Sequence, residues 1–238
     1  RYILGVYDLY DRLTTAFPQI LFESCASGGG RFDPGMLYYA PQGWISDDTD
    51  AAERVRIQYG TSMCYPISSM GSHVSVVPNH QLNRITSLHT RANVAYFGTF
   101  GYELDLNKLT DEEIAEVKAQ IIFMKEYREL IQFGNFYRLK SPFDGNETVW
   151  MTVSEDKRKA LVFWYRERNV VNAEFTRVRL QGLDPDLIYK NEYNGTENYG
   201  DELMNLGLLT TDVTAGEPTN EDLPCTDYES RIYVLTAE

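Results

Sequence analysis

The stretch from Phe22 to Arg54 reads FESCASGGGRFDPGMLYYAPQGWISDDTDAAER. It opens with a turn of small residues, Cys25 to Gly30, and closes with three clustered carboxylates, those of Asp47, Asp48 and Asp50. Asp50 and Glu53 have the spacing of a capping box, so a helix is expected to begin near Ala51. Asp47 and Asp48 then lie in the turn between a strand end and a helix start, where βα-repeat enzymes carry their catalytic groups.

Each of these pieces also has a purely structural interpretation. Clustered acids are typical of a solvated turn, and a run of glycines is typical of a tight turn. Neither the G-x-G-x-x-G fingerprint nor the G-x-x-x-x-G-K-[ST] loop occurs, so nucleotide binding has no support. The combination favours function, because two neighbouring strand ends carry unusual chemistry: a glycine loop with Cys25, and Trp44 next to acids.

The periodicity of apolar residues predicts two parts. In the first, helices are expected over 2–17, 51–59 and 114–133, a helical turn over 35–39, and short strands over 20–22, 43–46, 72–77 and 94–97. Gly60 and Gly134 are expected to stop the second and third helices. In the second part only strands are expected, over 149–153, 159–165, 175–180, 187–193 and 230–235. The change marks a boundary near 136–142, and four strand-to-helix units are half of an eight-stranded βα barrel.

Composition limits the classes of function. Hydrophobic residues make up 43% of the 238 residues, enough for a sizeable core. The net charge of −13 excludes nucleic acid and anionic membranes as partners and suits a neutral substrate. No apolar run is long enough to span a bilayer, so no membrane contact is expected. Three cysteines, Cys25, Cys64 and Cys225, are typical of a reducing compartment, and a cytoplasmic location is expected. The chain opens on Arg1, which leaves an upstream signal open.

Other constellations are weaker. The three histidines lack the H-x-x-x-H spacing of a helical zinc pair, and neither a metal nor a cofactor is expected. A Ser–His–Asp triad from Ser27, His73 and Asp47 is formally possible, but the G-x-S-x-G elbow is absent. The aromatic residues over 133–143 indicate packing between the two parts.

Several long motifs resemble glycoside hydrolase family 36, in particular the bacterial α-galactosidases that cleave raffinose-like sugars. The motifs are CASGGGRFDPGMLYY over 25–39, WISDDTD over 44–50, SMGSHVS over 69–75, VPNH over 77–80, FGTFGYELD over 97–105 and GDELM over 200–204. They run in order along essentially the whole chain. The resemblance implies the C-terminal half of a catalytic (β/α)8 TIM barrel over 1–137 and a C-terminal antiparallel β-sandwich domain over 138–238.

The resemblance also implies roles for particular residues. Asp47, in the family motif Trp-x-Ser-Asp, matches the acid/base of a retaining α-galactosidase, and Cys25, Gly28 and Trp44 match positions that bind the galactoside. The family's nucleophile is an Asp in a Lys-x-Asp motif, and no such motif precedes Asp47 here. The chain is therefore expected to need a missing N-terminal half as its partner, to be inactive alone, and to be homo-oligomeric when complete.

Alternatives from other classes remain. An α-N-acetylgalactosaminidase or a galactosyl transferase of the raffinose-synthase kind would use the same scaffold, but Cys25 favours plain galactose at the sugar's 2-position. The absent nucleophile is compatible with a non-catalytic carbohydrate-binding fragment. Outside the resemblance, Cys25 and Trp44 are also common as buried core residues.

Overall fold

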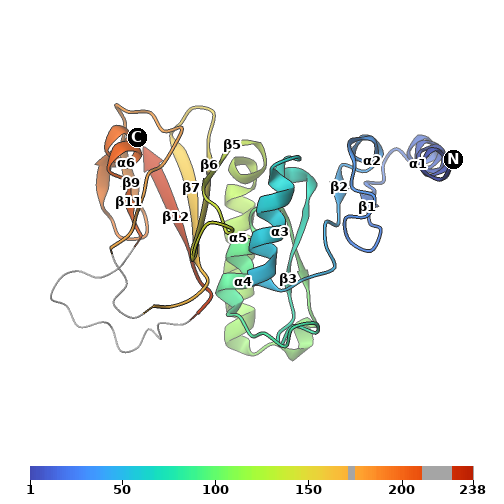
Figure 1. The fold of residues 1–238 in the computed structure, drawn as a ribbon, viewed down its shortest axis with the longest axis horizontal. Helices are drawn as coiled ribbons and strands as arrows, with labels where there is room; N and C mark the ends of the chain where they lie inside the picture. The colour runs from blue at the N-terminus through green and yellow to red at the C-terminus, as the bar shows by residue number, and fades with distance from the viewer. Residues whose placement is uncertain (171–174, 211–226, 238) are drawn as a thin grey trace.

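The computed structural model describes residues 1–170, 175–210 and 227–237. Its first part alternates helices with short strands, and Figure 1 shows it running from the N-terminus to the central helices. In order, the elements are α1 (Tyr2–Ala16), β1 (Glu23–Ser24), α2 (Pro34–Tyr39), β2 (Gln42–Gly43), α3 (Ala51–Ser62), η1 (Ile67–Ser69), β3 (Gly71–Ser75), α4 (Leu88–Ala95), β4 (Thr99–Glu103), η2 (Leu106–Lys108) and α5 (Asp111–Phe133).

The four strands of the first part are parallel neighbours in chain order. β1 pairs with β2 and β3 pairs with β4, both in parallel register. A further parallel bridge between Gly43 and Met70 joins the end of β2 to the residue before β3. The resulting order β1-β2-β3-β4, with a helix after each strand, is that of half a βα barrel, as predicted.

Local capping chemistry fixes the helix starts. The Asp50 carboxylate accepts hydrogen bonds from the first-turn N–H groups of Ala52 and Glu53, so α3 begins at Ala51 as predicted. At α5, the side chains of Thr110 and Glu113 form a complete capping box. The predicted end of α5 before Gly134 is also confirmed.

Several local predictions differ from the structure. The run over 94–97 is not a strand: α4 extends to Ala95, Ser87 caps it through the N–H of Thr90, and β4 starts at Thr99. A short apolar run has no period of its own, and here it is buried on all sides of a helix. Gly60 does not stop α3: it does not adopt the positive φ of a helix-ending glycine, and the helix continues to Ser62.

The first two strands are shorter than expected. β1 starts after the predicted run over 20–22, and Ile20 and Leu21 are 54% and 88% exposed. β2 ends at Gly43, so most of the predicted strand over 43–46 follows it as an extended turn. Both strands lie at the N-terminal end of the molecule, which stands apart from the central helices in Figure 1. Among the described residues, no further strand pairs with the outer edge of β1.

The second part is built on a six-stranded antiparallel sheet in the order β10-β9-β12-β7-β6-β5. Its strands are β5 (Asn135–Lys140), β6 (Glu147–Val153), β7 (Lys159–Arg166), β9 (Ile188–Asn191), β10 (Glu197–Tyr199) and β12 (Glu229–Ala237). A second, two-stranded sheet pairs β8 (Arg177–Val178) with β11 (Leu208–Leu209), next to the short helix α6 (Gly200–Asn205). The strands β5, β10 and β11 and the helix α6 were not predicted.

Both faces of the six-stranded sheet are buried. On β6, Trp150 faces the helices and belongs to the core that contains α3, α4 and α5. Its neighbours Val149 and Met151 face the other way, into a second core with β8, β11 and α6. Burial on both faces explains why β6 and β7 have continuous apolar runs instead of alternation. The predicted division at 137/138 falls within β5, directly after α5, and stays a prediction.

Candidate active site

The first two strand ends lie side by side. Ser24 pairs with Gly43 in the parallel ladder, and the N–H of Trp44 donates to the carbonyl oxygen of Ser24 at 2.8 Å. Cys25 and Trp44, each the first residue beyond its strand, are therefore neighbours at the carboxyl edge of the sheet. This is the edge at which βα barrels carry their active sites.

The glycine loop packs directly beneath the acidic turn. Gly28 has φ of +74°, and a Cβ built on it would lie 2.8 Å from the Cα of Ser46 and 3.0 Å from the backbone nitrogen of Asp47. A Cβ on the adjacent Gly29 would lie 2.9 Å from the carbonyl oxygen of Ile45. The glycines are therefore required by the close approach of two backbones. Sequence reasoning explained Gly28 by contact with a sugar hydroxyl, and that role stays a prediction.

The three clustered carboxylates differ in their contacts. Asp50 is buried, caps α3 and pairs with Arg84. The Asp48 carboxylate accepts a hydrogen bond from the N–H of Asp50 at 3.0 Å, and the N–H of Asp48 donates to Ser46 Oγ at 3.1 Å, so Asp48 shapes the turn. Asp47 is exposed, and among the described residues no side chain pairs with its carboxylate. Asp47 is thus the member of the cluster whose carboxylate is used neither by the turn nor by the helix cap.

Trp44 is half-buried and held by two side chains. The imidazole ring of His73 stacks on it with centroids 4.6 Å apart and an interplanar angle of 27°. The guanidinium carbon of Arg54 lies 5.0 Å from the centroid of the indole ring. Arg54 comes from the first turns of α3 and donates to the carbonyl oxygens of Ser46 and Gly71. Trp44 therefore has a fixed ring plane at the strand edge.

His73, Arg54 and Glu103 were not among the predicted site residues. Arg54 is only 2% exposed, and this burial lowers its pKa to about 10, while the charges of Asp48 and Glu103 act in the opposite direction. Glu103 ends β4, and its Oε2 lies 3.5 Å from Nδ1 of His73. The sequence holds a signal for the ring of His73: Gly101 lies inside β4, and a glycine within a strand marks a close approach by another group.

Cys25 lies at the surface, not in the core. Its side chain is exposed, and its carbonyl oxygen accepts a hydrogen bond from Arg31 Nη2 at 2.9 Å. Arg31 also donates to the hydroxyl of Tyr2 at 2.8 Å, which ties the glycine loop to α1. Cys25 and Cys64 are free thiols, and Cys225 lies outside the described residues. The alternative interpretation of Cys25 as a buried core residue is not supported by its exposure.

Two further observations concern metal-binding groups and membrane-spanning helices. Within 1–170, 175–210 and 227–237, no group of three or more histidine, cysteine and acidic side chains is arranged to hold a metal ion. None of the helices in that same part of the chain has the length and apolarity needed to cross a membrane.

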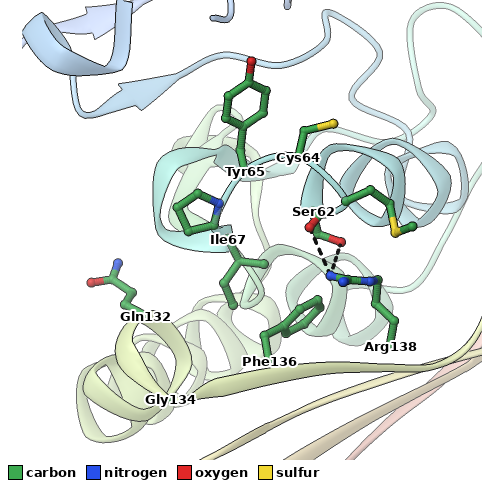
Figure 2. Close-up of a pocket in the computed structure, with 10 residues that line it drawn as sticks. Ser62, Cys64, Tyr65, Ile67, Gln132, Gly134, Phe136 and Arg138 are labelled. Carbon is green, nitrogen blue, oxygen red and sulfur yellow. Dashed lines mark hydrogen bonds between the residues drawn. The ribbon is translucent and has the colours of Figure 1, made fainter. Parts of the chain in front are cut away.

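A cavity of about 240 Å³, whose lining residues Figure 2 shows, does not include the acidic turn. It opens between the end of α3, η1, the end of α5 and β5, and Arg138 closes one side by donating to the carbonyl oxygen of Ser62 at 3.0 Å. Asp47 precedes the other end of α3, and a helix of that length separates them by about 18 Å. The cavity therefore belongs to the junction of the two parts and not to the candidate site.

Sequence profiles of two families together match most of the chain. The Melibiase profile matches residues 1–134, and the profile of the glycosyl hydrolase family 36 C-terminal domain matches residues 147–235.

Among curated relatives, alpha-galactosidase AgaA of Geobacillus stearothermophilus is 57% identical over 208 residues, 87% of this chain and 28% of the relative. The bifunctional alpha-galactosidase/sucrose kinase AgaSK of Mediterraneibacter gnavus is 51% identical over 207 residues, 87% of this chain and 22% of the relative. The chain thus spans less than a third of the length of these relatives.

Solved structures agree over the whole chain. A variant of AgaA from Geobacillus stearothermophilus, crystallised with raffinose, matches with a TM-score of 0.91 and 50% identity, over 100% of this chain and 31% of that one. The alpha-galactosidase from Lactobacillus brevis matches with a TM-score of 0.92 and 53% identity, over 100% and 32%. The predicted fold, the C-terminal half of a TIM barrel followed by an antiparallel β-sandwich, is confirmed.

Proposed function

Because this chain belongs to the Melibiase family, we propose that it is the part of a retaining α-galactosidase that supplies the acid/base carboxylate, Asp47. The observation that carries the proposal is that only one of the three carboxylates in the acidic turn is not engaged by the described fold. Asp48 and Asp50 are used by the fold, whereas Asp47 stands exposed at the carboxyl edge of the strands, beside Trp44 and above Gly28.

The proposed chemistry needs a second carboxyl group. A retaining glycosidase places two carboxyls roughly 5–5.5 Å apart, one to attack the anomeric carbon and one to protonate the leaving oxygen and then activate water. Asp47 takes the second role. The nucleophile is proposed to lie in a segment of the complete enzyme outside this chain.

The substrate is proposed to be a terminal α-linked galactoside such as melibiose or raffinose. The complex of the relative AgaA with raffinose supports this class. Cys25, Gly28 and Trp44 are the proposed sugar-contacting positions, with Trp44 offering an aromatic wall. Space beside the sugar's 2-substituent decides whether an acetamido group fits, and Cys25, a free and exposed thiol, is proposed to favour galactose at that position.

The complete enzyme is proposed to cover the apolar N-terminal end of this chain. None of the residues of α1 is buried, and Tyr2, Leu4 and Leu9 are at least half exposed. In an eight-stranded barrel, β1 would pair with the strand before it and α1 would pack against the neighbouring helices. Homo-oligomerisation, a cytoplasmic location and the division into domains at 137/138 are further parts of the proposal.

The test is Asp47→Asn in the complete enzyme. Loss of the general acid should reduce turnover of natural galactosides by about 10²- to 10⁴-fold, and turnover of an activated aryl galactoside less, because its leaving group needs little protonation. Added azide should restore turnover of the aryl substrate and give α-galactosyl azide, since azide attacks the covalent intermediate with net retention.

Asp186→Asn is the matched control, because Asp186 is an exposed aspartate of the second part and far from the strand edge. It should leave both activities unchanged. If azide gives β-galactosyl azide, Asp47 is the nucleophile. If both substrates lose activity equally and azide has no effect, Asp47 has no acid/base role.

A further inference from the structure

Two aromatic rings in the half barrel each lie over a glycine of the next strand. Trp44 stands beside Gly71, and His73 is the register partner of Gly101. A Cβ on Gly71 would lie 2.9 Å from Cε3 of Trp44, and a Cβ on Gly101 would lie 2.9 Å from Cδ2 of His73. Any other residue at either glycine would displace the ring above it. The two glycines therefore make room for one continuous pair of rings across β2, β3 and β4.

These rings are on the inner face of the strands. On β3, Ser72 Oγ donates to Gln58 of α3 at 2.8 Å, so Ser72 faces the helices. Side chains alternate along a strand, so His73 faces the opposite way, into the barrel. On β4, the hydroxyl of Tyr102 donates to Gln120 of α5 at 2.8 Å, which places Glu103 on the inner face as well.

His73 is fixed between a ring and a carboxylate. One face of its imidazole stacks on Trp44, and its Nδ1 atom is buried without a hydrogen-bond partner among the residues that the structure describes. The Oε2 atom of Glu103 lies 3.5 Å from that nitrogen, and the Glu103 side chain is 55% exposed. A buried N–H facing a carboxylate sets the tautomer and the orientation of an imidazole.

We propose that His73 is a positioning residue of the galactoside site: it holds the indole of Trp44 at the angle needed to contact the sugar, and Glu103 orients the imidazole. The inference rests on the proposed function, in which Trp44 is the aromatic wall. Arg54 anchors the indole from α3 through a buried guanidinium, so His73 is the contact of Trp44 that faces the barrel interior. Loss of the stack frees the indole to turn away from the sugar.

The first test is His73→Ala in the complete enzyme, with steady-state kinetics on an aryl α-galactoside and calorimetric titration with galactose. An aromatic stack is worth enough to raise KM and the dissociation constant of galactose about three- to tenfold, while kcat changes by less than about twofold. His73→Phe keeps the stack and should recover most of the affinity. His89→Ala, which removes an exposed histidine of α4, is the matched control and should change neither quantity.

A double-mutant cycle separates positioning from a general structural role. In a Trp44→Ala background, His73→Ala should have almost no further effect on galactose affinity, because the group it positions is gone. Additive losses of affinity would overturn the proposal, as would unchanged affinity in His73→Ala with a lowered melting temperature. Gly101→Ala is an independent variant that displaces the ring without removing it, and it should weaken galactose binding in the same direction.

Galactose affinity also distinguishes this inference from the proposed function. If Asp47→Asn keeps full activity while His73 and Trp44 remain coupled in galactose binding, the acid/base assignment fails and the positioning role stands. If Asp47→Asn behaves as an acid/base variant and the coupling is absent, the positioning role fails alone.

Discussion

At the scale of single residues, Gly28 links the glycine loop to the acidic turn. Two features require glycine at this position. Its φ is +74°, and a Cβ built on it would approach the Ser46–Asp47 peptide too closely. Gly28→Ala should therefore destabilise the protein by about 1–2 kcal/mol through the left-handed backbone alone. In addition, it should lower kcat, because the Cβ pushes the backbone of Asp47 away from its place. Chemical denaturation and steady-state kinetics measure the two effects.

Gly195→Ala is the matched control for this prediction. Gly195 has φ of +72°, and a Cβ built on it would meet nothing within 4 Å. It should show a similar loss of stability with unchanged kcat. Equal kcat in both variants would mean that the glycine loop does not position Asp47.

Part of the site could be predicted from the sequence, namely which residues lie together. Asp47, Cys25, Gly28 and Trp44 are neighbours in the structure because each follows a strand end, a local pattern that the sequence displays. Their roles toward a sugar remain predictions. The contacts of Trp44 with His73 and Arg54 depend on strand register and helix placement, which no local pattern specifies.

At the scale of elements, α3 depends on one buried carboxylate. Asp50 is 3% exposed, caps the helix through two N–H groups, and pairs with Arg84, which also lies 3.3 Å from Glu53 Oε1. Asp50→Ala should cost about 2–4 kcal/mol of stability, because it removes a cap and leaves the partly buried Arg84 without its main partner. Denaturant unfolding monitored by circular dichroism measures the change.

Asp50→Asn separates the two contributions, because asparagine caps a helix as well as aspartate does but carries no charge. It should retain the capping part and lose only the ion pair, so its stability should fall between those of the wild type and Asp50→Ala. Equal losses in the two variants would show that the cap contributes nothing measurable.

Helices that begin with a capping residue could be predicted from the sequence. Elements whose type depends on what buries them could not. The caps at Asp50 and Thr110 act within one turn: α3 starts at Ala51 as predicted, and α5 starts at Asp111, directly after its cap and one turn before the predicted run over 114–133. The run over 94–97 has no such signal inside it, and the decisive residue, Ser87, caps α4 well before the run. The exposed run over 20–22 has strand-like composition, but strand formation there requires a neighbour on the open side of β1.

At the scale of the whole molecule, the two parts share one core. Phe97, at the end of α4, packs against Trp150 and Phe163 of the sheet with ring centroids 5.8 and 5.7 Å apart. The change from mixed to all-β patterning was visible in the sequence, but this contact was not, because it joins residues far apart along the chain. Figure 1 shows the consequence: the sheet braces the central helices, while α1, α2, β1 and β2 stand at the far end.

The central claim is that this chain contributes the acid/base, Asp47, to a retaining enzyme whose nucleophile lies elsewhere. The most direct test is to trap the covalent intermediate of the complete enzyme with an inactivating α-galactoside and to map the galactosyl ester by peptide mass spectrometry. We predict that the ester lies on a carboxylate outside residues 1–238 and that Asp47 is unmodified. A galactosyl ester on Asp47, or on any other carboxylate of this chain, would contradict the claim.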